Sequence, residues 1–352
     1  MNPTPPPLVV QYLYVHDDGE AFFYPTARSA PSAARVAVRY LECALTQAAT
    51  LRLREVDCGL ALVINVSDRN ALGRAGARLL DRLAELGVEI IPAEYRHRPD
   101  PKGHHETYMS SRYLLDAILA CCEGQPEQRQ LWLTDLDCVW AAPEQVFAAA
   151  PPPPAIGHIE IPYPPDWVVI DFEGPGGTRT ALGELSAALG GSPELPRWIG
   201  GELLTGRPEA LRDLVAACEE VDRRLAERGE ALATEEQALT VAGALGLVDY
   251  ADLSGVARRI LTGPRHHAPK LDRPTRFGLW HLPSEKGLSL RRAAHEVLSG
   301  RDARLRRDLS DPDRLARRFN VAGTGVARRL RDDGWLASQR VQRRVLAALG
   351  SV

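Results

Sequence analysis

Short apolar runs alternate with longer amphipathic segments through the first half of the chain. The apolar runs have the length of buried strands and lie at residues 8–14, 60–66, 88–93 and from Leu131 onward. The segments between them repeat apolar residues at helical spacing, at about residues 32–51, 70–86 and 106–122. Ser67 and Asp68 are suited to cap the second of these helices, and Gly87 to end it.

Strand and helix therefore alternate, and the strands look apolar on both faces. This pattern predicts an α/β domain with a mostly parallel sheet flanked by helices. In such sheets ligands collect outside the carboxyl ends of the strands. The run from Leu131 ends at that edge in Asp135-Leu136-Asp137, so the sequence predicts a site at these two carboxylates.

The remainder of the chain changes composition twice. Residues 151–177 are rich in Pro and Gly, which predicts no regular structure, and their aromatics Tyr163, Trp167 and Phe172 suit either an acceptor-binding loop or lid, or a packed connection. From Leu288 the chain is predicted to be helical and dense in arginine, with one apolar face.

We therefore expect a core domain over residues 8–287 and an Arg-rich helical extension over 288–352. The extension is expected to dock on the core or on a second subunit, which would make a homodimer. Weak contact with an anionic membrane surface is the alternative.

Composition narrows the functional classes. The chain has 352 residues and a formal net charge of -3, so non-specific binding of nucleic acid is not expected. Its N-terminal segment lacks a signal-peptide pattern and no apolar run reaches membrane-spanning length, so we expect a cytoplasmic protein. The six cysteines form no Cys-x-x-Cys pair and are expected to be reduced core thiols. Heavy use of Ala, Arg, Pro and Leu is typical of a GC-rich bacterial genome.

Asp135 and Asp137 have the spacing to hold a hard divalent cation against a diphosphate. No Gly-rich phosphate loop follows any of the predicted strands. A nucleotide bound at this sheet would therefore need a metal ion and basic side chains to neutralise its phosphates. The strand ends at residues 14–17 and 66–68 are positional candidates for the nucleoside pocket.

Further segments extend this chemistry in a fixed order along the chain. They are residues 107–114 (TYMSSRYL), 135–137 (DLD), the pair 198–204 (WIGGELL) and 234–239 (TEEQAL), and 280–287 (WHLPSEKG). Together these motifs resemble those of GT-A glycosyltransferases, and are most similar to the retaining glycogenin and lipopolysaccharide-galactosyltransferase type, over about residues 8–287.

The resemblance implies a metal-dependent transferase. It would move a sugar from a nucleoside-diphosphate sugar, with UDP favoured as the nucleotide, to a hydroxyl of an unknown carbohydrate or small-molecule acceptor. Asp135, Asp137 and His281 would hold Mn²⁺ or Mg²⁺. Asp135 would alternatively contact the ribose or bind the metal through water.

Other positions would bind the substrate. The resemblance implies that Lys286 pairs with the diphosphate and that Arg112 reaches the donor. Gly200 and Gly201 match a segment that lies at the substrate in this family. The chain departs from the family pattern, because Ile199 replaces an Asn and the spacing from His281 to Lys286 is one residue shorter than expected.

The catalytic assignment follows the segment after Thr234. In retaining relatives a Gln at the position of Gln237 lies near the anomeric carbon, and Glu236 stands where the family has Asp. Retaining transfer at Gln237 and Glu236 is therefore the prediction. Glu202, Glu235 or Glu236 would instead serve as the general base of an inverting reaction.

Two other classes of function remain open. Residues 133–139 also resemble the first motif of haloacid-dehalogenase-type phosphatases, in which Asp135 would be the nucleophile. Against it, three strand–helix units precede the motif, which usually opens the domain. No later Asp-Asp pair is predicted at a strand end, since Asp332-Asp333 falls in the Arg-rich tail. A fold that binds nucleotide sugars without catalysis is the other alternative. His104-His105-Glu106 and His266-His267 are weaker candidates for metal or acid–base chemistry.

Overall fold

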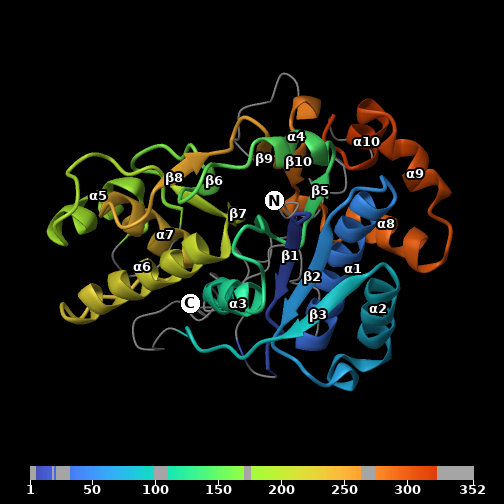
Figure 1. Cartoon of the computed structure of the whole chain (residues 1–352), viewed down its shortest axis with the longest axis horizontal. Helices are drawn as coiled ribbons and strands as arrows, with labels where there is room; N and C mark the ends of the chain where they lie inside the picture. Colours follow the sequence, from blue (N-terminus) through green and yellow to red (C-terminus); the bar gives the residue numbers. More distant parts are fainter. Residues whose placement is uncertain are drawn as a thin grey trace, which may run out of the picture.

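The computed structural model of the chain describes residues 5–17, 20, 32–98, 110–169, 176–262 and 274–322. A seven-stranded sheet forms its centre (Figure 1). From edge to edge its strands are β3 (Val88–Pro92), β2 (Gly59–Ile64), β1 (Leu8–Leu13), β4 (Leu131–Thr134), β7 (Ile199–Gly206), β6 (Ile156–Glu160) and β8 (Tyr250–Asp252). β7 runs antiparallel to β4 and β6, and the other neighbours are parallel. The predicted mostly parallel sheet is confirmed.

A second, three-stranded sheet branches from the end of β4. In its order β5 (Cys138–Trp140), β10 (Leu279–His281) and β9 (Ala257–Arg259), the central strand β10 is antiparallel to β5 and parallel to β9. Because β5 starts directly after Asp137, this sheet brings the segment around residue 280 against the predicted aspartates.

Helices flank the central sheet, as the amphipathic segments predicted (Figure 1). They are α1 (Ala33–Arg52), α2 (Gly73–Glu85), α3 (Tyr113–Cys122), α4 (Pro143–Ala148), α5 (Arg179–Ala188), α6 (Pro208–Ala226) and α7 (Glu235–Ala244), with short 3₁₀ helices η1 (Arg69–Leu72), η3 (Pro274–Arg276) and η4 (Pro283–Glu285). α3 begins later than predicted, after a 3₁₀ turn at residues 110–112, and residues 99–109 lie outside the described residues.

The Arg-rich region begins with three helices that pack into the same hydrophobic core as the central sheet. They are α8 (Ser289–Leu298), α9 (Ala303–Leu309) and α10 (Pro312–Arg318). α8 packs on α1, and Leu290, Leu305 and Phe319 belong to the same buried cluster as the strands. The predicted docking on the core is thus present for these helices. Residues 323–352 lie outside the described residues, and a domain boundary at residue 288 stays a prediction.

One prediction from composition was wrong. β6 is a regular strand within the Pro- and Gly-rich region 151–177. It forms because both of its edges pair, with β7 on one side and β8 on the other. Of the aromatics there, Trp167 is 46% exposed and Tyr163 is partly buried, while Phe172 lies outside the described residues.

All six cysteines are buried and free, as expected for core thiols. Among the helices in the described ranges, none is both long and apolar enough to cross a membrane.

Candidate metal centre and active-site pocket

The two predicted aspartates stand where β4 leaves the sheet. β4 is fully buried, and its apolar side chains hold the strand in the core up to Thr134. The backbone N–H of Asp135 still donates to the carbonyl of Glu202 in β7, at 3.1 Å. The Asp135 side chain is 32% exposed, whereas that of Asp137 is 1% exposed. One carboxylate therefore faces solvent and the other is held inside.

His281 completes the cluster from a distant part of the sequence. It lies opposite Cys138 in the β5–β10 ladder, and the N–H of Leu282 donates to the carbonyl of Asp137 at 2.9 Å. Its Nε2 is 3.2 Å from Asp135 Oδ2 and 3.3 Å from Asp137 Oδ2. One ligand atom from each of the three residues lies within 4.8 Å of the others.

The donor set fits a divalent cation. Asp137 Oδ2 and both ring nitrogens of His281 are buried, and within the described ranges none makes a hydrogen bond of good geometry. Nδ1 faces Glu202 Oε1 at 3.6 Å, which leaves Nε2 toward the aspartates. A carboxylate behind a ligating imidazole is the arrangement that orients such ligands. Two carboxylates and one imidazole suit Mn²⁺ and also accept Mg²⁺.

The charges within the cluster shift the pKa values of its own members. Burial disfavours the imidazolium, but Asp137, Asp135 and Glu202 together raise the pKa of His281 well above its ordinary value. Burial likewise opposes ionisation of Asp137, yet Lys286 and His281 lower its pKa. The neighbouring carboxylates thus favour a proton on His281, and a cation at Nε2 would compete with it.

A pocket of about 320 Å³ opens beside the cluster. Asp135, Asp137 and Lys286 line it, and Lys286 Nζ lies 3.2 Å from Asp137 Oδ2 and 5.0 Å from the ring centre of Tyr40. The remaining lining residues are Tyr12, Leu13, Tyr14, His16, Tyr40, Ser110, Ser111, Leu136 and Glu235. The predicted nucleoside segment 14–17 thus contributes two rings to this wall.

Sequence reasoning missed Tyr12 in this pocket. Its hydroxyl donates to Asp135 Oδ1 at 2.8 Å, and burial, followed by the charge of Asp135, raises its pKa, so it remains a donor. No local signal indicates this contact, because it depends on β1 and β4 being neighbours in the sheet.

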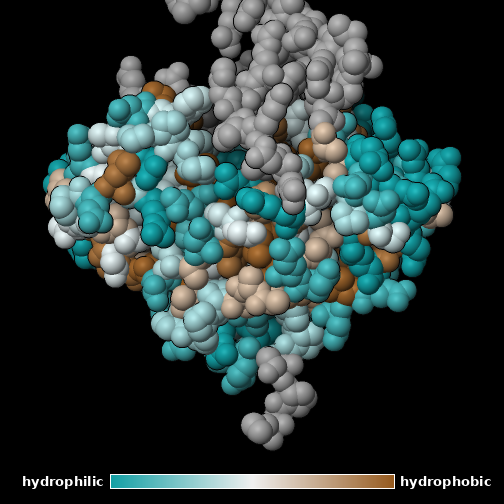
Figure 2. Space-filling model, turned by 90° about the horizontal axis from the view of Figure 1, so that it is seen from above, coloured by the Kyte–Doolittle hydropathy of each residue, from teal (hydrophilic) through white to brown (hydrophobic). Residues whose placement is uncertain are grey.

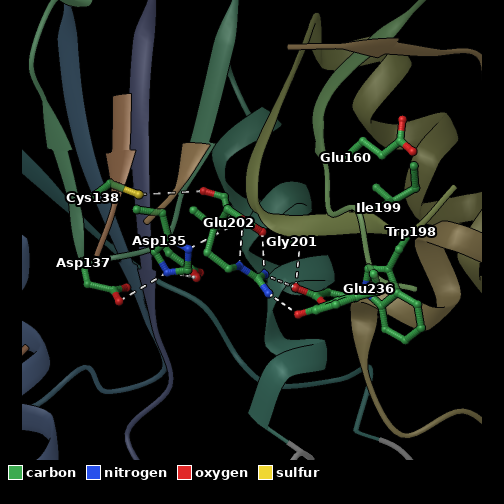
Figure 3. A network of polar contacts seen from close by, with 12 residues as sticks. Asp135, Asp137, Cys138, Glu160, Trp198, Ile199, Gly201, Glu202 and Glu236 are labelled. Atoms are coloured by element: carbon green, nitrogen blue, oxygen red, sulfur yellow. Dashed lines mark hydrogen bonds and ion pairs between the residues drawn. The ribbon is translucent and has the colours of Figure 1, made fainter. Parts of the chain in front are cut away.

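A second polar network continues from the metal cluster (Figure 3). Arg259, opposite His281 in the β9–β10 ladder, donates to both carboxylate oxygens of Glu202, at 2.9 and 2.7 Å. It also donates to Glu236 Oε1 at 2.5 Å, and Trp198 Nε1 donates to Glu236 Oε2 at 2.7 Å. Burial opposes the charge of Glu202, but Arg259 and then His281 lower its pKa to about 2.

The predicted catalytic segment divides between different environments. Gln237 is fully buried, and its amide serves a capping box at the start of α7 and donates to the carbonyl of Gly176 at 2.8 Å. Both carboxylate oxygens of Glu236 are bonded in the Arg259 network. Glu235 is the member that lines the pocket, with a buried Oε2 that has no hydrogen-bond partner among the described residues. Burial, and then the charge of Glu236, raise the pKa of Glu235 to about 7.

The predicted substrate-binding residues lie in different surroundings from one another. Lys286 lines the pocket, but Arg112 is 3% exposed, pairs with Asp222 of α6 and is not among the pocket's lining residues. Gly200 and Gly201 lie inside β7. A Cβ on Gly201 would lie 2.7 Å from Glu235 Oε1, so this glycine makes room for that carboxyl group. Their contact with substrate stays a prediction.

The fold and the cluster together define an α/β protein with a candidate divalent-metal centre at the carboxyl end of its sheet. No protein-family model matches the chain, and no curated protein sequence matches it. Solved structures of glycosyltransferases do align with it.

The galactosyltransferase LgtC, solved with donor and acceptor sugar analogs, has 11% identity and a TM-score of 0.48, with 83% of this chain and 95% of that chain covered. The apo bifunctional glycosyltransferase WbbM has 11% identity and a TM-score of 0.45, with 80% and 46% covered. Apo mouse xyloside xylosyltransferase 1 has 16% identity and a TM-score of 0.43, with 79% and 97% covered.

Proposed function

We propose that this protein is a metal-dependent glycosyltransferase that moves a sugar from a nucleoside-diphosphate sugar to an acceptor hydroxyl. The observation that carries the proposal is the meeting of Asp135, Asp137 and His281 in one cluster, with Lys286 in the same pocket. A carboxylate-rich pocket would repel a diphosphate, so a cation held by these ligands and the ammonium group of Lys286 would make its binding favourable.

Each residue has a definable task in such a transfer. When bound, Mn²⁺ or Mg²⁺ supplies positive charge to the diphosphate leaving group. Tyr12 orients Asp135 through its hydrogen bond, and Glu202 faces the far nitrogen of His281. The aromatic wall that includes Tyr14 and His16 offers apolar surface for the nucleoside. The family resemblance favours UDP as the nucleotide. The acceptor would be a carbohydrate or other small molecule.

Whether the transfer retains or inverts the anomeric configuration depends on whether Glu235, whose carboxyl group faces the pocket, acts as a base. A retaining transfer, as the resemblance predicts, needs no protein base. Gln237 and Glu236, which do not line the pocket, would then act by positioning the residues that do. Glu235 supports the inverting alternative, since a carboxyl group with a pKa of about 7 suits a general base. The anomeric configuration of the product, read by NMR, separates the two. Inversion, together with loss of transfer in Glu235→Gln, would assign the base to Glu235.

The test is a thermal-shift series with UDP, GDP, ADP and dTDP, each with Mn²⁺ and with EDTA, on the wild type, Asp137→Asn and Lys286→Gln. A ligand that binds only the folded state raises the melting temperature by mass action. We expect one nucleotide to stabilise the wild type only with metal, and both variants to lose the shift. Asp252→Asn, on β8 at the far edge of the sheet, is the matched control and should keep it.

The absence of a shift with every nucleotide would contradict the proposal. The phosphatase alternative is not favoured, because its proposed nucleophile Asp135 is bonded to Tyr12 and shares one cluster with His281. Nucleotide binding without any transfer or hydrolysis of a matching nucleotide sugar would instead support a binding protein.

A further inference from the structure

A second cavity lies outside the candidate active site, among α8, α9 and α10. Its volume is about 570 Å³, compared with about 320 Å³ for the active-site pocket, and no residue lines both. Five arginines and two carboxylates account for most of its lining. They are Arg292, Arg304, Arg314, Arg317, Arg318, Glu296 and Asp308.

Helical spacing explains why these charges converge. In α8, Arg292 and Glu296 are four residues apart, and in α9 the same spacing separates Arg304 from Asp308. Residues three and four apart share one face of a helix. In α10, residues 317 and 318 come three and four positions after residue 314, so all three helices turn an arginine-bearing face toward one cavity.

A single arginine pairs with both carboxylates. Arg318 donates to Glu296 Oε2 at 2.5 Å and to Asp308 Oδ2 at 2.9 Å, and its side chain is only 7% exposed. Its Nε is buried and has no hydrogen-bond partner within the described ranges. The acids are therefore occupied, and they leave a buried donor of this guanidinium without an acceptor.

The other arginines leave the cavity positively charged. Arg314 pairs with Asp311, outside the cavity lining, at 3.1 Å. For Arg292, Arg304 and Arg317, no ion pair is formed with any carboxylate in the described part of the chain. Converging guanidinium groups repel one another, and an anion would relieve that repulsion.

We propose that this cavity binds a phosphate-bearing anion, in the form of a phosphate monoester or a diphosphate group. Guanidinium groups offer paired N–H donors that match phosphate oxygens, and several arginines can share one such group. The cavity has the size of a small-molecule site. The helices α9 and α10 that line it lie at a side of the molecule that is strongly hydrophilic in Figure 2. The proposal does not depend on transferase activity.

Isothermal titration with inorganic pyrophosphate in EDTA tests the proposal. The cavity variant is Arg304→Gln/Arg317→Gln, and the matched control is Arg301→Gln/Arg307→Gln, which removes two arginines of the same region that do not line the cavity. All four side chains are exposed, so both proteins should fold. We expect the cavity variant to bind roughly tenfold or more weakly, and the control within about twofold of the wild type.

Lys286→Gln separates this cavity from the active site. It should keep pyrophosphate binding in EDTA, whereas loss of binding in this variant together with retention in Arg304→Gln/Arg317→Gln would overturn the proposal. Equal weakening in the cavity variant and in the arginine control would do the same, because it would indicate only a general effect of net charge.

Vesicles identify the source of the phosphate. The wild type is sedimented with phosphatidylcholine vesicles with and without phosphatidic acid. Co-sedimentation that needs phosphatidic acid and is lost in Arg304→Gln/Arg317→Gln assigns the cavity to a lipid headgroup. Pyrophosphate binding without co-sedimentation assigns it to a soluble phosphorylated molecule. Absence of both, or vesicle binding that the cavity variant retains without any pyrophosphate binding, overturns the proposal.

Discussion

Two clusters of buried charge meet at Glu202, and they differ in how completely their polar atoms are bonded (Figure 3). On one side, Arg259 bonds both oxygens of Glu202, and Arg259 and Trp198 together bond both oxygens of Glu236. On the other side, buried atoms of Asp137 and His281 have no hydrogen bond of good geometry within the described residues.

The difference separates a structural role from a binding role. Buried polar atoms without a hydrogen bond of good geometry cost free energy, so they are candidates for bonding to a ligand. Each cluster joins two carboxylates to one cationic or protonatable side chain, and the incomplete bonding marks the Asp135, Asp137 and His281 cluster as the candidate ligand site.

Replacing Arg259 should cost stability. Arg259→Met keeps a side chain of similar length but leaves Glu202, which is 0% exposed, without its main partner. Removing one member of a buried ion pair typically destabilises a protein by about 3–5 kcal/mol. Urea unfolding measures the change. Arg258→Met, at the neighbouring position, is the control and should stay within about 0.5 kcal/mol of the wild type. A loss below about 1 kcal/mol for Arg259→Met would show that the network is not structural.

Replacing Asp137 should affect function more than folding. Asp137→Asn removes one anionic ligand from the cluster, so we expect a loss of about 10³-fold in metal-dependent kcat/KM, since a catalytic metal supplies several kcal/mol. Sugar transfer from the nucleotide sugar found by thermal shift is the measurement, with circular dichroism to confirm folding. If Asp137→Asn kept wild-type activity, the cluster would not be the metal centre.

Glu235 should make stability depend on pH. Its pKa rises from 4.5 to about 7 on folding, so the folded state retains a proton that the unfolded state releases between these values. Stability should therefore fall as the pH rises from about 4.5 to 7, by about 3 kcal/mol. In Glu235→Gln this component should disappear, and the variant should be the more stable protein at pH 8. Chemical unfolding in EDTA at several pH values checks this, and an unchanged pH profile in the variant would refute it.

Gly201 should have the smallest effect. In Gly201→Ala the new Cβ would meet Glu235 Oε1 at 2.7 Å, but a carboxyl group can rotate away, so unfolding free energy should change by less than about 1 kcal/mol. The displaced Glu235 should lose part of its pH-dependent contribution to stability. Gly255→Ala, where a Cβ would meet no atom within 4 Å, is the control. Equal pH profiles for the two variants would argue against this role of Gly201.

Local pattern was sufficient for one half of the sheet. The strands β1 to β4 and the helices α1 and α2 were predicted near their observed positions, because each depends on periodicity within its own segment. The small strands β9 and β10 carry no such signal, since three residues are too few for a period to appear. β6 was missed because its pairing, rather than its composition, makes it a strand.

The same distinction applies to the candidate site. The motif around Gln237 was visible in the sequence, but a Thr followed by Gln three residues later is also a capping box, and the structure shows that use. Arg112 pairs with Asp222, where α3 packs on α6, and its contact with the donor stays a prediction. A motif supplies the residue type, and tertiary neighbours decide which atoms remain available to a ligand.

The sequence by itself predicted that two carboxylates would stand at the end of a buried strand, because a short, continuous apolar run precedes Asp135, and the structure has this strand. Through its resemblance to a family motif, the sequence also indicated His281 as a metal ligand and Lys286 as a partner of the diphosphate. Only the tertiary structure decided that Glu202 and Arg259 stand behind His281, that Glu235 faces the pocket, and that three helices turn arginines toward one cavity. These contacts join residues far apart in the chain, and strand pairing and helix packing at such separations leave no trace in local periodicity.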